Sequence, residues 1–156
     1  MFEVERDPAV VELGVFVEQE PSTVWRALTE PDLIAQWLSP TTGFAPRVGT
    51  TFIVEVPTPD DSAAEMACQV TVVDPPRRLT YSWTDLRGDP PQRWLVDWQL
   101  SPHGHGTRIL MTMSGFDIAD RRQKMARNAV ERGWDRTVLP ALVRVVGETG
   151  PDRQVP

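Results

Sequence analysis

The chain has 156 residues, which is the usual length of one domain and enough to bury a core without disulfides or metals. Hydrophobic residues make up 40% of it and charged residues 24%, a globular composition that excludes wholesale disorder. The formal net charge of −6 disfavours nucleic acid as the main partner, because an acidic surface repels phosphates.

The N-terminal residues lack the basic start and the apolar stretch of a secretion signal. No segment approaches the ~18 consecutive apolar residues that a membrane-spanning helix requires. We therefore expect a soluble, cytoplasmic protein that does not insert into a membrane.

Two short helices in tandem are predicted after an initial strand. Pro21 suits a first helical turn, and apolar residues follow it at positions 24, 25 and 28. Pro31 then restarts the chain ahead of Leu33, Ile34 and Trp37, which are again spaced as on one helix face.

Strands are predicted between residues 51 and 114, where apolar residues recur at every second position. Turn clusters rich in proline and glycine separate them at 57–61, 75–76, 88–91 and 101–104. This pattern is typical of antiparallel strands with one dry and one solvent-exposed face. The inward face of residues 66–73 stays ambiguous between Cys68, Val70 and Val72 on one side and Ala67 and Val73 on the other.

A long amphipathic helix is predicted from Asp120 to Val146, because apolar residues recur at 126, 130, 134, 138, 142 and 146. Asp120 and Gln123 match a variant of the capping box at its start. Pro140 lies inside the pattern, and proline costs about 3 kcal/mol in a helix interior, so we expect a kink one turn earlier or a short break. Residues 151–156 are expected to form a flexible tail.

The order of these elements predicts an α+β fold: one strand, two short helices, about five strands and a long helix. The strands should form a curved antiparallel sheet whose dry concave face is covered by the long helix. No linker, repeat or low-complexity tract interrupts the chain. We therefore expect a single domain over residues 1–150.

Five ordered segments carry a family resemblance: PSTVWRALTEP with LIAQW at 21–37, DPPRRLTYSW at 74–83, GTRI at 106–109, SGF at 114–116 and GW at 133–134. Together they resemble the SRPBCC (START-like, helix-grip) superfamily, and most closely its branch related to the C-terminal domain of the activator of the heat-shock chaperone ATPase. The resemblance implies a helix-grip fold. It implies no single function, because members include lipid carriers, polyketide cyclases, self-resistance proteins and chaperone activators.

Candidates for catalysis or metal binding all have simpler interpretations. His103 and His105 fall in a predicted hairpin turn without a third ligand nearby. Cys68 is interpreted as a buried inert thiol, and the basic group at 121–127 as a solvated helix face. Where the related branch often has a histidine before Ser-Gly-Phe, this chain has Met113, which removes a titratable group from the expected cavity wall. No catalytic residue, cofactor or metal site is predicted.

Aromatic and methionine side chains on the predicted dry faces are the most informative feature. They either fill the core or line a pocket of about 300–1,000 Å³ between sheet and helix, suited to a flat aromatic ligand. Trp25 and Trp37, on the short helices, are interpreted as packing residues. The candidate ligand-binding residues are Phe52, Tyr81, Trp83, Trp94, Trp98, Met111, Met113, Phe116, Trp134 and Val138.

Three functions remain in competition. The leading hypothesis is non-catalytic binding, as a carrier, sensor or sequestration protein, of a hydrophobic and aromatic small molecule. A polyketide cyclase or aromatase would instead need a titratable side chain inside the pocket. A chaperone-activator-like interaction protein would have a filled core and an exposed apolar patch. Homodimerisation and contact with a chaperone are left open.

Overall fold

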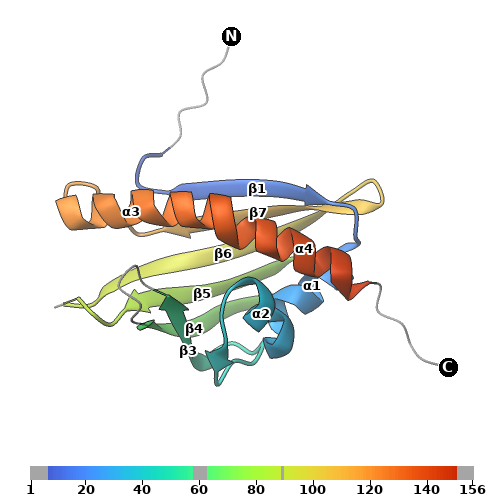
Figure 1. Cartoon of the computed structure of the whole chain (residues 1–156), viewed down its shortest axis with the longest axis horizontal. Helices are drawn as coiled ribbons and strands as arrows, with labels where there is room; N and C mark the ends of the chain where they lie inside the picture. The colour runs from blue at the N-terminus through green and yellow to red at the C-terminus, as the bar shows by residue number, and fades with distance from the viewer. Residues whose placement is uncertain (1–6, 58–62, 89, 151–156) are drawn as a thin grey trace, which may run out of the picture.

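The computed structural model describes residues 7–57, 63–88 and 90–150, and it is built around one antiparallel sheet (Figure 1). The sheet has seven strands in the order β1-β7-β6-β5-β4-β3-β2. Its strands are β1 (Val11–Val17), β2 (Thr41–Thr42), β3 (Thr51–Pro57), β4 (Ala63–Asp74), β5 (Arg78–Asp85), β6 (Gln92–His103) and β7 (Gly106–Ser114). The helices are α1 (Pro21–Thr29), α2 (Pro31–Trp37), α3 (Arg121–Gly133) and α4 (Leu139–Thr149), with a π-helical turn, η1 (Trp134–Val138), between the last two.

The α+β class and the helix-grip architecture are confirmed. The C-terminal helix crosses one face of the curved sheet, and the two short helices lie at the end of the sheet beside α4 (Figure 1). The two-residue strand β2 was missed, because Thr41 and Thr42 form too short a segment to show alternation. The turn predicted at 57–61 and the tail predicted at 151–156 fall mostly or wholly outside the described residues.

Strand register places the predicted dry faces together on the side of the sheet that faces the helices, here called the inner face. Tyr81 of β5 lies opposite Val96 of β6, which lies opposite Met113 of β7. All three are buried, whereas Arg93 and Gln99 of β6 are exposed on the opposite, outer face. Because side chains alternate along a strand, local parity alone was enough to predict these faces.

Strand β4 resolves the one ambiguous face by an irregularity. Its pairing with β5 shifts register between Val70 and Val72. Before the shift Cys68 and Val70 are buried on the inner face, and after it Val73 lies opposite the inward Leu79 and packs against the core. Each predicted set is therefore correct in part, because a bulge reverses the parity of every residue beyond it. Val72 and Ala67, the remaining members of the two sets, face outward.

Helices α1 and α2 form as predicted, each with a proline at its first position. Pro21 and Pro31 supply the fixed φ of a first turn, where a missing N–H costs no hydrogen bond. The helices are tied together by the Trp37 indole, whose Nε1 donates to the Ala27 carbonyl at 2.8 Å. The Trp37 ring also contacts Trp98 of β6, with the two centroids 5.5 Å apart.

The C-terminal helix is interrupted one turn before Pro140, as expected. The backbone adopts π-helical geometry over Trp134–Val138 and returns to α-helix at Leu139. Proline has no N–H to donate to the carbonyl four residues earlier, and its ring crowds that carbonyl. A π-bulge accommodates this defect without breaking the helix.

The start of α3 is capped differently from the prediction. Asp120 accepts a hydrogen bond from the Arg122 N–H at 2.9 Å, as an N-cap residue should. The Gln123 side chain, however, accepts from the Asp117 N–H at 2.8 Å and not from that of Asp120. The predicted reciprocal half of the capping box is therefore wrong, because the preceding turn offers Gln123 another donor. Among the described residues, no helix combines the length and apolar character needed to cross a lipid bilayer.

Candidate functional site

The aromatic residues singled out from the sequence meet in one cluster on the inner face. All ten candidates belong to or pack against a single hydrophobic core. Nine of them are buried, and Val138 on the π-helical turn is partly buried. The structure thus brings the whole predicted set together, although the strands and helix that supply it are far apart in the sequence.

Ring contacts join the aromatic members in separate groups, and Trp83, Trp134 and Trp98 form one of them. The Trp134 ring, from the π-helical turn, lies between Trp83 and Trp98, with both centroid distances 5.9 Å. Trp94 stacks on Phe116 with centroids 4.8 Å apart and planes tilted by 27°. Edge-to-face and offset contacts of this kind stabilise aromatic pairs beyond the area that they bury.

Two aromatic residues that contact a candidate ring were not among the candidates. Trp37 was interpreted as helix packing, and it does anchor α2, but its ring also contacts Trp98. Phe44, which follows β2, contacts Phe52 at a centroid distance of 5.0 Å. No periodic signal surrounds Phe44, so only the tertiary structure could have identified it.

The space between sheet and helix is occupied by these side chains. Trp98, Met111 and Met113 have no exposed surface, and Trp134 is only 6% exposed. Hollows lined by the described residues lie elsewhere. One of about 360 Å³ is beside the start of α3 and another of about 500 Å³ is on the outer face of β1, β7 and β6. The pocket expected beneath the helix is therefore closed in this structure.

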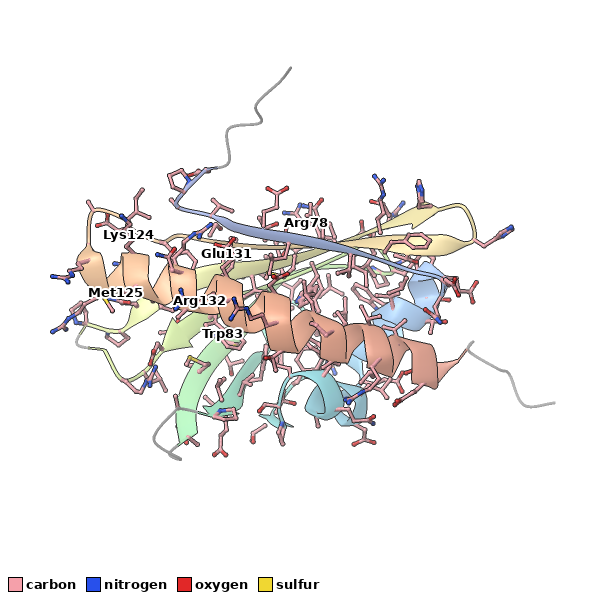
Figure 2. The ribbon with its side chains drawn as sticks, turned by 45° about the horizontal axis from the view of Figure 1, so that its top comes forward. Arg78, Trp83, Lys124, Met125, Glu131 and Arg132 are labelled. Carbon is pink, nitrogen blue, oxygen red and sulfur yellow. The ribbon has the colours of Figure 1, made fainter. Side chains whose placement is uncertain are left out.

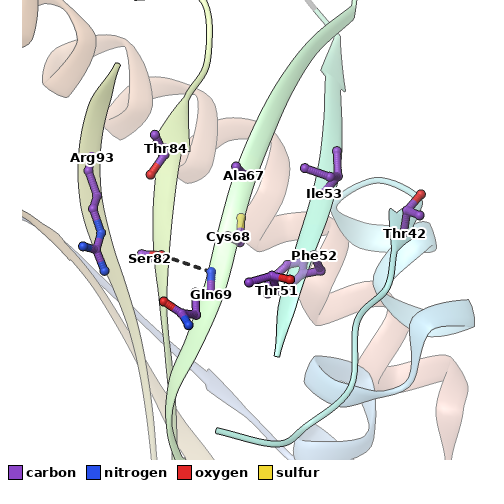
Figure 3. A pocket seen from close by; sticks show the side chains of 10 residues that line it. All are labelled: Thr42, Thr51, Phe52, Ile53, Ala67, Cys68, Gln69, Ser82, Thr84 and Arg93. Atoms are coloured by element: carbon purple, nitrogen blue, oxygen red, sulfur yellow. Dashed lines mark hydrogen bonds between the residues drawn. The ribbon is translucent and has the colours of Figure 1, made fainter. Parts of the chain in front are cut away.

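A further hollow of about 370 Å³ lies on the outer face of β3, β4, β5 and β6 (Figure 3). Its floor is formed over the small residues Ala67 and Ser82, and the Gln69 N–H donates to the Ser82 hydroxyl at 3.0 Å. Phe52 and Cys68 also contribute to its lining, although both residues are buried and their side chains face the inner side of the sheet. This hollow thus lies on the outer face, and Phe52 belongs both to its lining and to the aromatic cluster.

Burial keeps the titratable groups of the cluster protonated. Desolvation raises the pKa of the Cys68 thiol to about 12. The pKa of Tyr81 is also raised, mainly by desolvation, although the Trp98 indole donates to its hydroxyl at 3.0 Å. Neither group carries charge at neutral pH, which agrees with the interpretation of Cys68 as an inert thiol and leaves the cluster without a base.

One polar group of the cluster has no partner. The Trp94 indole nitrogen is buried and makes no hydrogen bond within the part of the chain that the structure describes. The indole nitrogens of Trp37 and Trp98, by contrast, are both satisfied. A buried donor without an acceptor costs free energy, so such a group in a folded protein calls for an explanation.

The two halves of the C-terminal helix cover the sheet to different extents. In α4, Leu139, Leu142 and Val145 are buried, whereas α3 has no buried residue. Met125 of α3 is 63% exposed (Figure 2). The side chain of Arg127 fastens α3 to β1 by donating to the Val10 carbonyl at 2.9 Å. Helix α3 is therefore the less firmly packed part of the roof over the cluster.

The polar residues of the outer face form a structural network. Asp97 accepts from Arg78 at 3.0 Å, from Thr80 at 2.7 Å and from Gln99 at 2.9 Å. Burial alone would raise the pKa of Asp97, but these hydrogen bonds and the Arg78 charge outweigh it and lower the pKa. His103 and His105 lie at the exposed β6–β7 hairpin, as predicted.

Comparison with known proteins identifies the wider group. The family described as Activator of Hsp90 ATPase homolog 1-like protein matches residues 18–147. A search among curated proteins returned no match. Among solved structures, a protein from Mesorhizobium loti is 30% identical, with 91% of this chain and 99% of that one covered and a TM-score of 0.77.

Two more distant structures share the fold. A Chromobacterium violaceum protein is 20% identical over 94% of this chain and 100% of its own, with a TM-score of 0.77. DynU16, from the dynemicin biosynthetic locus, is 20% identical with a TM-score of 0.71, over 93% of this chain and 49% of that one. This chain therefore spans about half the length of DynU16. At this level of identity the likeness bears on the fold alone.

Proposed function

Because this chain belongs to the family of Activator of Hsp90 ATPase homolog 1-like proteins, we propose that it binds a hydrophobic, flat aromatic small molecule between the inner face of the sheet and the C-terminal helix. The observation that carries the proposal is the continuous cluster of Trp83, Trp98 and Trp134. Indole rings offer large apolar faces against which a flat ligand can pack.

Ligand entry requires the cluster to open, and helix α3 is the element that can move to open it. Helix α3 has no buried residue, and the π-helical turn that carries Trp134 joins it to the firmly packed α4. A small movement of α3 about this turn would withdraw Trp134 from the two rings that it separates. The bound ligand then contacts the ring faces that opening exposes. Little apolar surface is therefore left exposed in the complex.

Binding without catalysis is favoured by the state of the inner titratable groups. Cys68 and Tyr81 both have raised pKa values and hold their protons at neutral pH. Neither can serve as a general base there, and proton transfer to or from a ligand needs such a group. The chemistry of the cluster therefore suits a carrier, sensor or sequestration protein better than a cyclase.

Titration with indane, a neutral fused-ring hydrocarbon, tests the proposal. We expect saturable shifts of the indole N–H signals of Trp83, Trp98 and Trp134 in nitrogen-edited NMR spectra, because the ligand replaces their mutual ring contacts. Trp25 on α1 is the internal control, since it makes no ring contact among the described residues. Shifts that never saturate, or that affect Trp25 equally, would contradict the proposal.

A second candidate function, a protein-interaction module, is favoured by apolar side chains on the outer face. Phe16 is 51% exposed and Leu95 38% exposed, and Phe16 and Leu110 line the hollow of about 500 Å³. Exposed apolar side chains on an uncovered sheet face are typical of contact surfaces. The closed core agrees with this function as well.

The ATPase rate of purified Hsp90, measured with and without this chain, tests the second function. If the outer face makes the contact, the chain changes the rate and Phe16→Ser abolishes the effect. Val48→Ser is the matched control, because Val48 is 66% exposed but lies outside the sheet. An unchanged rate with the unmodified chain removes this candidate.

A further inference from the structure

We infer that the Trp94 indole N–H is the group that selects the ligand, and that the ligand is a neutral aromatic ketone. This inference rests on the proposed function and specifies the chemistry of the molecule bound. It starts from the one indole nitrogen of the cluster that is buried and unpartnered among the described residues. A carbonyl oxygen at the edge of a bound ring system would supply the missing acceptor.

The position of Trp94 is fixed before any ligand arrives. Its ring is 5% exposed and stacks on Phe116, while its backbone is held opposite Trp83 in the pairing of β5 with β6. A donor that is held in one orientation loses little conformational freedom when it forms a hydrogen bond. Trp94 is therefore pre-organised as a donor and is not a flexible side chain that happens to lack a partner.

A glycine lies beside the donor edge of this indole. Gly115 has a φ of +100°, and a Cβ added there would lie 3.7 Å from Trp94 Cδ1, the carbon bonded to the indole nitrogen. A larger side chain at this position would approach the same edge of the ring. Gly115 thus adds no side chain of its own at that edge.

The rest of the cluster excludes charged ligands. Among the described residues the one buried charged side chain is Asp97, which lies on the outer face and accepts a hydrogen bond from Arg78. Burying a carboxylate or an ammonium without a partner is costly, whereas a ketone oxygen needs only one donor. The neutral carbonyl compound is therefore the class that the site accommodates best.

Competition between 1-indanone and indane tests the inference, because the two molecules differ by one carbonyl oxygen. We expect the unmodified protein to prefer indanone to indane, as measured by the ratio of the indane Kd to the indanone Kd. In Trp94→Phe this ratio should be smaller by about tenfold. Phenylalanine keeps the aromatic face and removes only the donor. Trp37→Phe is the control, because its indole N–H is already bound to Ala27, and we expect it to leave the ratio unchanged.

The outcomes separate the two proposals. Indane binding with the same ratio in Trp94→Phe overturns the inference and leaves the proposed function standing. Absence of binding by both compounds overturns both. Should Trp94→Phe fold poorly, NMR spectra of the unmodified protein still test the inference. Indanone should move the Trp94 indole proton signal downfield, and indane should not. A Trp94 proton that responds equally to both compounds contradicts the inference.

Discussion

Replacing Trp98 by alanine is expected to cost about 3–5 kcal/mol of folding free energy, the largest loss at any single position of the cluster. Trp98 has no exposed surface, and its ring contacts both Trp37 and Trp134. Its removal leaves a cavity and deprives the Tyr81 hydroxyl of its indole donor. Thermal unfolding should show a melting temperature lower by about 10–15 °C.

Trp134→Ala is the informative comparison for this variant. Trp134 is buried to a similar degree but lies on the π-helical turn, where the helix can adjust. If it lines an opening pocket, its stability loss should be smaller than that of Trp98→Ala, and indane affinity should fall. Equal losses at both positions, with no change in indane binding, would mean that the rings serve only as core packing.

Gly106→Ala is expected to destabilise the protein by about 1–3 kcal/mol or more, because the added methyl group has no space. A Cβ at Gly106 would overlap the Val17 carbonyl oxygen and lie 2.7 Å from Phe16 Cζ. That oxygen belongs to β1, which pairs with β7 along its whole length. Relief of the overlap would require the end of β1 to separate from β7, and urea denaturation measures the resulting loss.

Gly14→Ala is the matched control for Gly106→Ala, since both glycines lie in the β1–β7 pair. The nearest atom to a Cβ at Gly14 is the Ile109 carbonyl oxygen at 3.7 Å, an ordinary van der Waals contact. Alanine restricts the unfolded chain more than glycine, so we expect a gain of about 0.5–1 kcal/mol. If the two variants lose equal stability, the steric explanation for Gly106 is wrong.

Local chemistry accounts for the elements that were predicted correctly. Pro21 and Pro31 define helix starts through their own fixed φ, and alternation along β5 to β7 defines inner and outer faces without reference to any neighbour. Features that depend on a neighbouring strand were predicted less well. The bulge after Val70, for example, is a mismatch between two strands and cannot be inferred from one of them.

The candidate site shows the same division. Strand alternation predicted the inward placement of the candidates on β3 and on β5 to β7, and helical spacing that of Trp134 and Val138, whereas Phe44 lacked any periodic signal. Whether the cluster is open or closed could not be predicted, because it depends on how far Trp134 reaches between Trp83 and Trp98. That reach is set by the π-helical turn, whose position Pro140 indicates but whose geometry it does not specify.

The amino-acid pattern by itself determined the α+β class, the order of the elements and the side chains that face inward, because each follows from backbone preferences within a few residues. Packing of distant segments decided the rest: the closed aromatic interior, the looser seating of α3 and the unpartnered indole of Trp94. These properties depend on contacts between elements that are far apart in the sequence. Such contacts form only when the chain folds, so no local pattern of residues reports them.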